Sequence, residues 1–179
     1  SDFALIWHAI FYLLVAAIIF VWRPSNKILA LIICLPVLSV AAFAWLSGNP
    51  FNGILFSVLT VLLIVSGLKA SNDTIVTSQI PFMVIGILMI TFGLVYPHFI
   101  GAGTFLKYLY ASPAGLIPCP TLSIVIGILL VYNGLGSQYI TLSLIIYGLF
   151  YGVFGALKLA VYIDIFLVFC TLSLLAKYI

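Results

Sequence analysis

Cys119 is the side chain best suited to chemistry, because it lies between Pro118 and Pro120 at the start of an apolar run. The prolines keep the chain extended, so we expect Cys119 at the N-terminus of a helix, accessible from the outer face of a membrane. The partial positive charge at that terminus favours thiolate. A redox thiol, a soft-metal ligand and part of a solute gate are the functional interpretations. The structural alternative is a tight turn in which the small thiol fills a gap.

Two histidines, His8 and His98, are further candidate ligands, and His98 directly follows Tyr96-Pro97. A metal site with Cys119 would require three separate helices to meet, and the chain has no ligand spacing typical of metal motifs. We therefore interpret both histidines as hydrogen-bonding residues near the membrane surface. The sequence predicts no metal and no other cofactor.

Lys158 and Asp164 flank the last break between apolar runs. Charged groups near the ends of spans reach the headgroups at little cost, so an ion pair across the turn is the simplest expectation. A charged lining for a pathway is the alternative. The chain has no Ser/His/Asp set, carboxylate pair or phosphate loop, so we predict no catalytic residue and no enzyme.

The composition determines which elements position these side chains. Hydrophobic residues make up 66% of the 179, against six Lys or Arg and three Asp or Glu. Soluble domains are about 25% charged, so a soluble enzyme and a disordered chain are excluded. The net charge of +3 is dispersed, which argues against nucleic-acid binding. We predict an all-α, polytopic transmembrane helical bundle, with residues 1–179 as a single transmembrane domain.

Polar, Gly-rich and Pro-rich breaks divide the chain into about seven apolar runs, each predicted to be a spanning helix. The runs are residues 3–22, 28–46, 51–68, 80–95, 119–133, 139–157 and 163–176. The break near 159–163 is weak, so six spans are the alternative. The connection around 97–120 mixes Gly, Pro, aromatic and basic residues, which predicts an interfacial or re-entrant segment on the outer face. This segment either caps a cavity or only covers the bundle.

Basic residues near the ends of the spans predict the orientation. Four fall on one side and two on the other: Arg23, Lys27, Lys69 and Lys177 against Lys107 and Lys158. We therefore expect the N-terminus outside and the C-terminus inside, in a multi-pass protein of the cell (inner) membrane. Asn49-Pro50 is then expected at the N-terminus of a helix that starts on the outer face, since Asn is a good N-cap and Pro suits the first helical position.

The run 139–157 carries small residues about one turn apart: Gly148, Gly152, Gly155 and Ala156. Such a stripe lets helices approach closely. It predicts tight packing inside the bundle or at a contact with another subunit.

The pair Tyr96-Pro97 and the later block 118–121, Pro-Cys-Pro-Thr, together resemble a family signature. The family consists of small bacterial polytopic membrane proteins that carry only a domain-of-unknown-function label. In it, Tyr-Pro ends one span and Pro-Cys-Pro-Thr opens the next. The resemblance extends over most of the chain, through Asn49-Pro50 and the Gly152…Gly155-Ala156…Asp164 pattern, while His98 and Lys158 depart from it. It implies a helical membrane fold and assigns no reaction, substrate or cofactor.

Two classes of function fit these observations. The favoured one is a non-catalytic structural or accessory subunit of a membrane complex, with the lipid bilayer, other membrane subunits or a second copy as partners. The alternative is a passive or weakly coupled pathway for a small neutral solute or gas. An ion-coupled pump would need buried carboxylates, and residues 28–157 contain none within their apolar runs.

Overall fold

The computed structural model describes residues 2–97 and 105–179, and within these ranges every regular element is helical. The α-helices are α1 Asp2–Phe20, α2 Asn26–Leu46, α3 Pro50–Lys69, α4 Ile80–Leu94, α5 Pro118–Val131, α6 Gln138–Lys158 and α7 Ile165–Tyr178. Short 3-10 helices are η1 Phe105–Leu109, η2 Asn133–Gly136 and η3 Tyr162–Asp164. The all-α prediction is confirmed, and each α-helix begins and ends within two residues of its predicted run. The last two runs form separate helices.

Three helices, α2, α3 and α6, are long and apolar enough to cross a membrane. The helices α4, α5 and α7 have 15, 14 and 14 residues, which is fewer than the roughly 20 that a simple span needs. The structure is thus compatible with a membrane protein. The count of seven spans remains a prediction.

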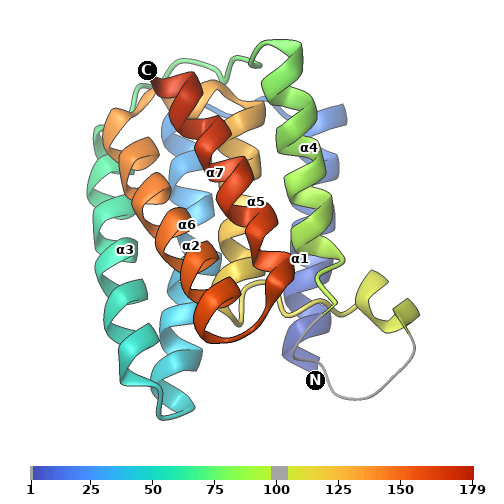
Figure 1. Cartoon of the computed structure of the whole chain (residues 1–179). Helices are drawn as coiled ribbons and strands as arrows, with labels where there is room; N and C mark the ends of the chain where they lie inside the picture. Colours follow the sequence, from blue (N-terminus) through green and yellow to red (C-terminus); the bar gives the residue numbers. More distant parts are fainter. Residues whose placement is uncertain (1, 98–104) are drawn as a thin grey trace.

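The helices run up and down side by side, with α1 beginning at one end of the bundle and α7 ending at the other (Figure 1). We call these the Asp2 end and the Lys177 end. Helix α2 packs along α3, α4 along α5, and α6 along α7. Helix α5 lies in the middle, since every residue from Cys119 to Val131 is buried.

The backbones of α4 and α5 touch at two glycines. A Cβ added at Gly86 would lie 2.7 Å from the carbonyl oxygen of Gly127, and a Cβ at Gly127 would lie 2.7 Å from the carbonyl oxygen of Gly86. Neither position therefore accepts a side chain unless the two helices separate.

The small residues of α6 face α7. A Cβ at Gly148 would lie 2.5 Å from the Thr171 hydroxyl oxygen, and one at Gly152 would lie 2.6 Å from a methyl of Val168. Ala156 is also buried. The stripe thus packs inside the chain.

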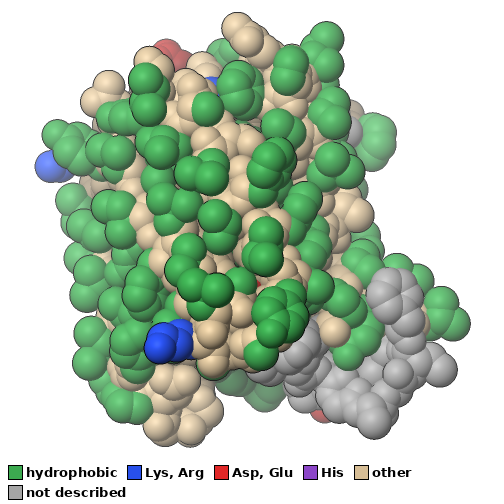
Figure 2. Space-filling view, in the orientation of Figure 1, with side chains coloured by type: hydrophobic (Ala, Val, Ile, Leu, Met, Phe, Trp, Pro, Cys, Tyr) green, Lys and Arg blue, Asp and Glu red, His purple; other side chains and the backbone are tan. Residues whose placement is uncertain are grey.

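The outer surface of the bundle is largely apolar. Figure 2 shows hydrophobic side chains over much of the described part of the visible face, with very few charged ones between them. A surface of this kind suits contact with lipid chains or with other membrane helices.

Replacing Gly152 with Leu tests the packing of α6 on α7. We expect a loss of folded protein, or a stability decrease of about 1–3 kcal/mol, because the added side chain must push α7 away. The measurement is unfolding of the detergent-purified protein. Val153→Leu is the matched control, since Val153 is 45% exposed. Equal stability of the two variants would contradict this packing.

Candidate functional site

A buried hydrogen bond joins the segment after α4 to the start of α7. Tyr96 donates its hydroxyl to Oδ1 of Asp164 at 2.6 Å, and the two residues are 0% and 1% exposed. Burial, the neighbouring Cys119 thiol and Asp164 raise the pKa of Tyr96, so its hydroxyl stays protonated and remains a donor. A Cβ at Gly155 would lie 2.0 Å from Oδ2 of Asp164, so this glycine makes room for the carboxylate. The bond holds α4, α6 and α7 together at the Asp2 end.

Cys119 belongs to the same buried cluster. Its thiol interacts with Tyr96 and Asp164, its sulfur lies 4.0 Å from the Tyr151 carbonyl oxygen, and only 7% of the residue is exposed. The prediction of an accessible thiol is wrong, because Cys119 follows the first residue of α5 and is buried against Tyr151 of α6 and Asp164 of η3. Desolvation of the buried thiol opposes the effect of the helix N-terminus on its ionisation. A small thiol that fills a packed site fits this position.

The other predicted positions around the helix starts do not join the cluster. Asn49 and Pro50 are exposed at the start of α3, where the Asn49 side chain accepts a hydrogen bond from the Asn52 backbone N–H at 3.1 Å. Pro97 is exposed after α4, and Pro120 is buried in the first turn of α5. Their placement accounts for where helices begin and end.

Lys158 lies apart from the carboxylate with which we expected it to pair. It is exposed at the end of α6, whereas Asp164 is turned inward toward Tyr96 and Gly155. Within the described residues no ion pair joins Lys158 to Asp164, so the expected pair across the turn is not formed. The reason is that η3 turns the carboxylate into the bundle before α7 begins.

His8 is a buried hydrogen-bonding residue in the part of the chain that the structure describes. Its Nδ1 accepts from the Ser112 backbone N–H at 3.2 Å, so Nε2 carries the proton and donates to the Leu109 carbonyl at 2.9 Å. No ring nitrogen is then left for a metal. His98 lies outside the described residues. Among those described, no three His, Cys, Asp or Glu side chains are grouped as metal ligands.

The later half of the predicted segment 97–120 enters the bundle. Residues 111–115 are buried, and the Ser112 hydroxyl donates to the Gly93 carbonyl of α4 at 3.1 Å. Gly115 has φ +78°, and a Cβ there would lie 2.6 Å from the Trp7 ring. Its N–H donates to the Thr121 hydroxyl at 2.8 Å. This half therefore packs between α1, α4 and α5.

Two tyrosines fasten α6 to α3, a role that the sequence did not indicate. Tyr151 donates its hydroxyl to Oδ1 of Asn52 at 2.9 Å, and Tyr147 donates to the Leu55 carbonyl at 2.8 Å. The only available signal is a pair of tyrosines one turn apart in an apolar run. Such a pair is equally typical of residues near headgroups.

Lys177 binds the end of α5 at the Lys177 end of the bundle. Its ammonium donates to the Ser78 hydroxyl and lies 3.4 Å from the carbonyl oxygens of Leu129 and Leu130. The Ser78 backbone N–H donates to the Val131 carbonyl at 2.8 Å. A cation beside the last carbonyls of a helix is favourable. The sequence pattern indicates only a surface charge at Lys177.

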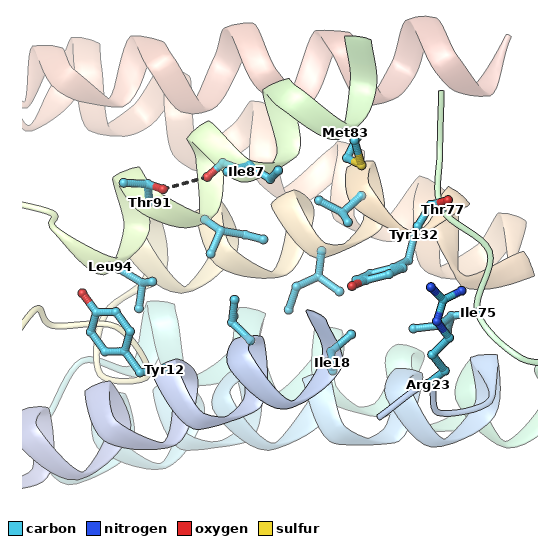
Figure 3. Close-up of a pocket in the computed structure, with 14 residues that line it drawn as sticks. Tyr12, Ile18, Arg23, Ile75, Thr77, Met83, Ile87, Thr91, Leu94 and Tyr132 are labelled. Carbon is cyan, nitrogen blue, oxygen red and sulfur yellow. Dashed lines mark hydrogen bonds between the residues drawn. The ribbon is translucent and has the colours of Figure 1, made fainter. Parts of the chain in front are cut away.

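A cavity of about 320 Å³ lies between α1 on one side and α4 and α5 on the other. Figure 3 shows Arg23 and Tyr132 together at one end of it and Tyr12 at the other. The sequence did not reveal this cavity, because isolated apolar residues that face a cavity look the same as those that face lipid.

Replacing Tyr96 with Phe tests the buried hydrogen bond. We expect a stability loss of about 1–3 kcal/mol, because the carboxylate of Asp164 stays buried after losing a donor. The measurement is denaturant unfolding in detergent micelles. Tyr162→Phe is the control, since Tyr162 lies in η3 with Asp164 but is 71% exposed. If both variants are equally stable, the buried bond does not hold the helix ends.

No family model, curated protein or solved structure matches this chain. The resemblance to the family with the Pro-Cys-Pro-Thr signature therefore stays a hypothesis that rests on the motif.

Proposed function

We propose that this chain is a multi-pass protein of the cell membrane in which all seven helices cross the bilayer, with the N-terminus outside and the C-terminus in the cytoplasm. The distribution of cations supports this orientation. Arg23, Lys27, Lys69 and Lys177 lie at the Lys177 end, where α1 and α3 finish, α2 begins and α7 finishes. Lys158 lies at the Asp2 end. Cytoplasmic ends carry the excess of Lys and Arg.

Within that membrane, the chain acts as a non-catalytic structural or accessory subunit of a larger complex. The observation that carries this proposal is the filled centre of the bundle, where α5 is buried from Cys119 to Val131. The groups best suited to chemistry form hydrogen bonds that hold helices or segments together, as with His8, Tyr96 and Lys177. A packed interior and an apolar exterior suit a protein that acts by contacting other membrane proteins.

An aromatic surface on α3 and α6 supports contact with another membrane subunit. The Phe51 ring lies 6.1 Å from the Phe150 ring and 5.9 Å from the Phe154 ring, centre to centre. Phe51 and Phe150 remain 48% and 41% exposed. Aromatic residues are enriched in protein interfaces. Because the small residues of α6 already face α7, association through α6 uses this aromatic surface.

The test is the size of the assembly extracted in mild detergent, with a reporter fused after Ile179 to follow the chain. We expect a cytoplasmic reporter signal and migration in a complex larger than a small oligomer of this chain. Phe150→Ala combined with Phe154→Ala is expected to release the chain from that complex.

Ile146→Ala is the matched control, because Ile146 is on the same helix and 63% exposed. Migration of the wild type as a lone small oligomer would contradict the accessory role and favour a pathway for a small solute. A reporter signal outside the cell would reverse the orientation.

A further inference from the structure

The cavity between α1 and α4 is a groove that opens sideways. Its rim includes Tyr12 on α1 and Ile87 and Thr91 on α4, and all three are exposed. Its floor is made by buried residues of α5, among them Ile128 and Val131. In a membrane, the opening would face lipid chains.

The walls of the groove are apolar along its length. Met83, Ile87, Ile90 and Leu94 line it from α4, and Figure 3 shows Met83, Ile87 and Leu94 spread from one end of the groove to the other. The Thr91 hydroxyl donates to the Ile87 carbonyl at 2.9 Å within the same helix. The Thr91 hydroxyl therefore already has a hydrogen-bond partner, and a ligand in the groove would contact mainly hydrocarbon side chains on this wall.

The two ends of the groove differ. At the Lys177 end, the Arg23 guanidinium lies near Tyr132 and Thr77 (Figure 3). Within the described residues Arg23 forms no ion pair with a carboxylate. Toward the other end, the Tyr12 hydroxyl donates to the Leu109 carbonyl at 3.4 Å, which ties the rim to η1. The groove thus has a cation, Arg23, at one end, and Tyr12 limits it toward the other.

The length of the groove matches one leaflet. Eleven residues separate Met83 from Leu94 on α4, which corresponds to about 16 Å of helix. The hydrocarbon core of a bilayer is about 30 Å thick. One leaflet contributes about half of that thickness, so the groove is about as long as an acyl chain in one leaflet.

We propose that this groove binds one acyl chain of an anionic phospholipid whose phosphate lies against Arg23. The guanidinium matches a phosphate in charge and geometry. The hydroxyls of Tyr132 and Thr77 line the same end and are available as additional donors. Basic pockets between membrane helices are known to hold anionic headgroups, and in this chain the apolar groove adds a place for the tail.

The experiment measures lipid binding to the purified full chain in mild detergent by native mass spectrometry. The probes are phosphatidylglycerol and phosphatidylcholine with identical acyl chains, and inorganic phosphate. The wild type is expected to prefer phosphatidylglycerol. Arg23→Gln is expected to weaken phosphatidylglycerol binding about fivefold and to leave phosphatidylcholine binding unchanged, since one cation at the surface is removed. Arg23→Lys is expected to keep the preference.

Two matched controls separate the groove from general effects. Lys27→Gln removes a neighbouring cation that does not line the groove, and it is expected to bind as the wild type does. Ile87→Trp fills the groove and is expected to weaken both lipids, whereas Ile146→Trp on the exposed face of α6 is expected to weaken neither. Equal binding of the two lipids, an equal effect of Lys27→Gln, or no effect of Ile87→Trp would overturn the proposal. Competition by inorganic phosphate at lipid-like concentrations would also overturn it, because it would indicate an anion site that needs no tail.

Discussion

Helix α5 is short and is surrounded by the other helices, and this combination determines what many polar residues of the chain must do. Its 14 residues correspond to about 21 Å of helix, less than the roughly 30 Å of a hydrocarbon core. The ends of a helix carry backbone groups without partners inside the helix. In a membrane these groups lie at a depth where water does not satisfy them, so the protein itself must supply the partners.

The last carbonyls of α5 meet such partners, and its beginning is held by side-chain contacts. At its end, Lys177 and Ser78 bind the last carbonyls and the following turn. At its beginning, the hydroxyl of Thr121 accepts from the buried segment that precedes the helix, and Cys119 packs into the Tyr96–Asp164 cluster. These polar residues and the Cys119 thiol thus lie where they help to stabilise a buried helix. Among the described residues, a groove between α1 and α4 is left unfilled.

The sequence predicted the helices well because apolar runs and Gly, Pro and Asn breaks act locally, as at Asn49-Pro50 and Pro118. It failed where two distant segments meet. Nothing in the local pattern places Tyr96 against Asp164, 68 residues later, or turns Cys119 inward. Lys158 and Asp164 are close in sequence, which made an ion pair the natural expectation. The inward turn of Asp164 depends on space that Gly155 provides on another helix, and that space is visible only in three dimensions.

The most direct test of a central, enclosed α5 is photolabelling with a small apolar carbene reagent dissolved in the bilayer of reconstituted vesicles. Labelled residues are then mapped by peptide mass spectrometry. The structure predicts label on exposed positions such as Leu13, Val61 and Ile146, which are 72%, 59% and 63% exposed, and none between Leu122 and Gly127, which are buried and do not line the groove. Label on residues 122–127 comparable to that on Ile146 would contradict the central place of α5, and with it the role of the polar residues at its ends in holding a buried helix.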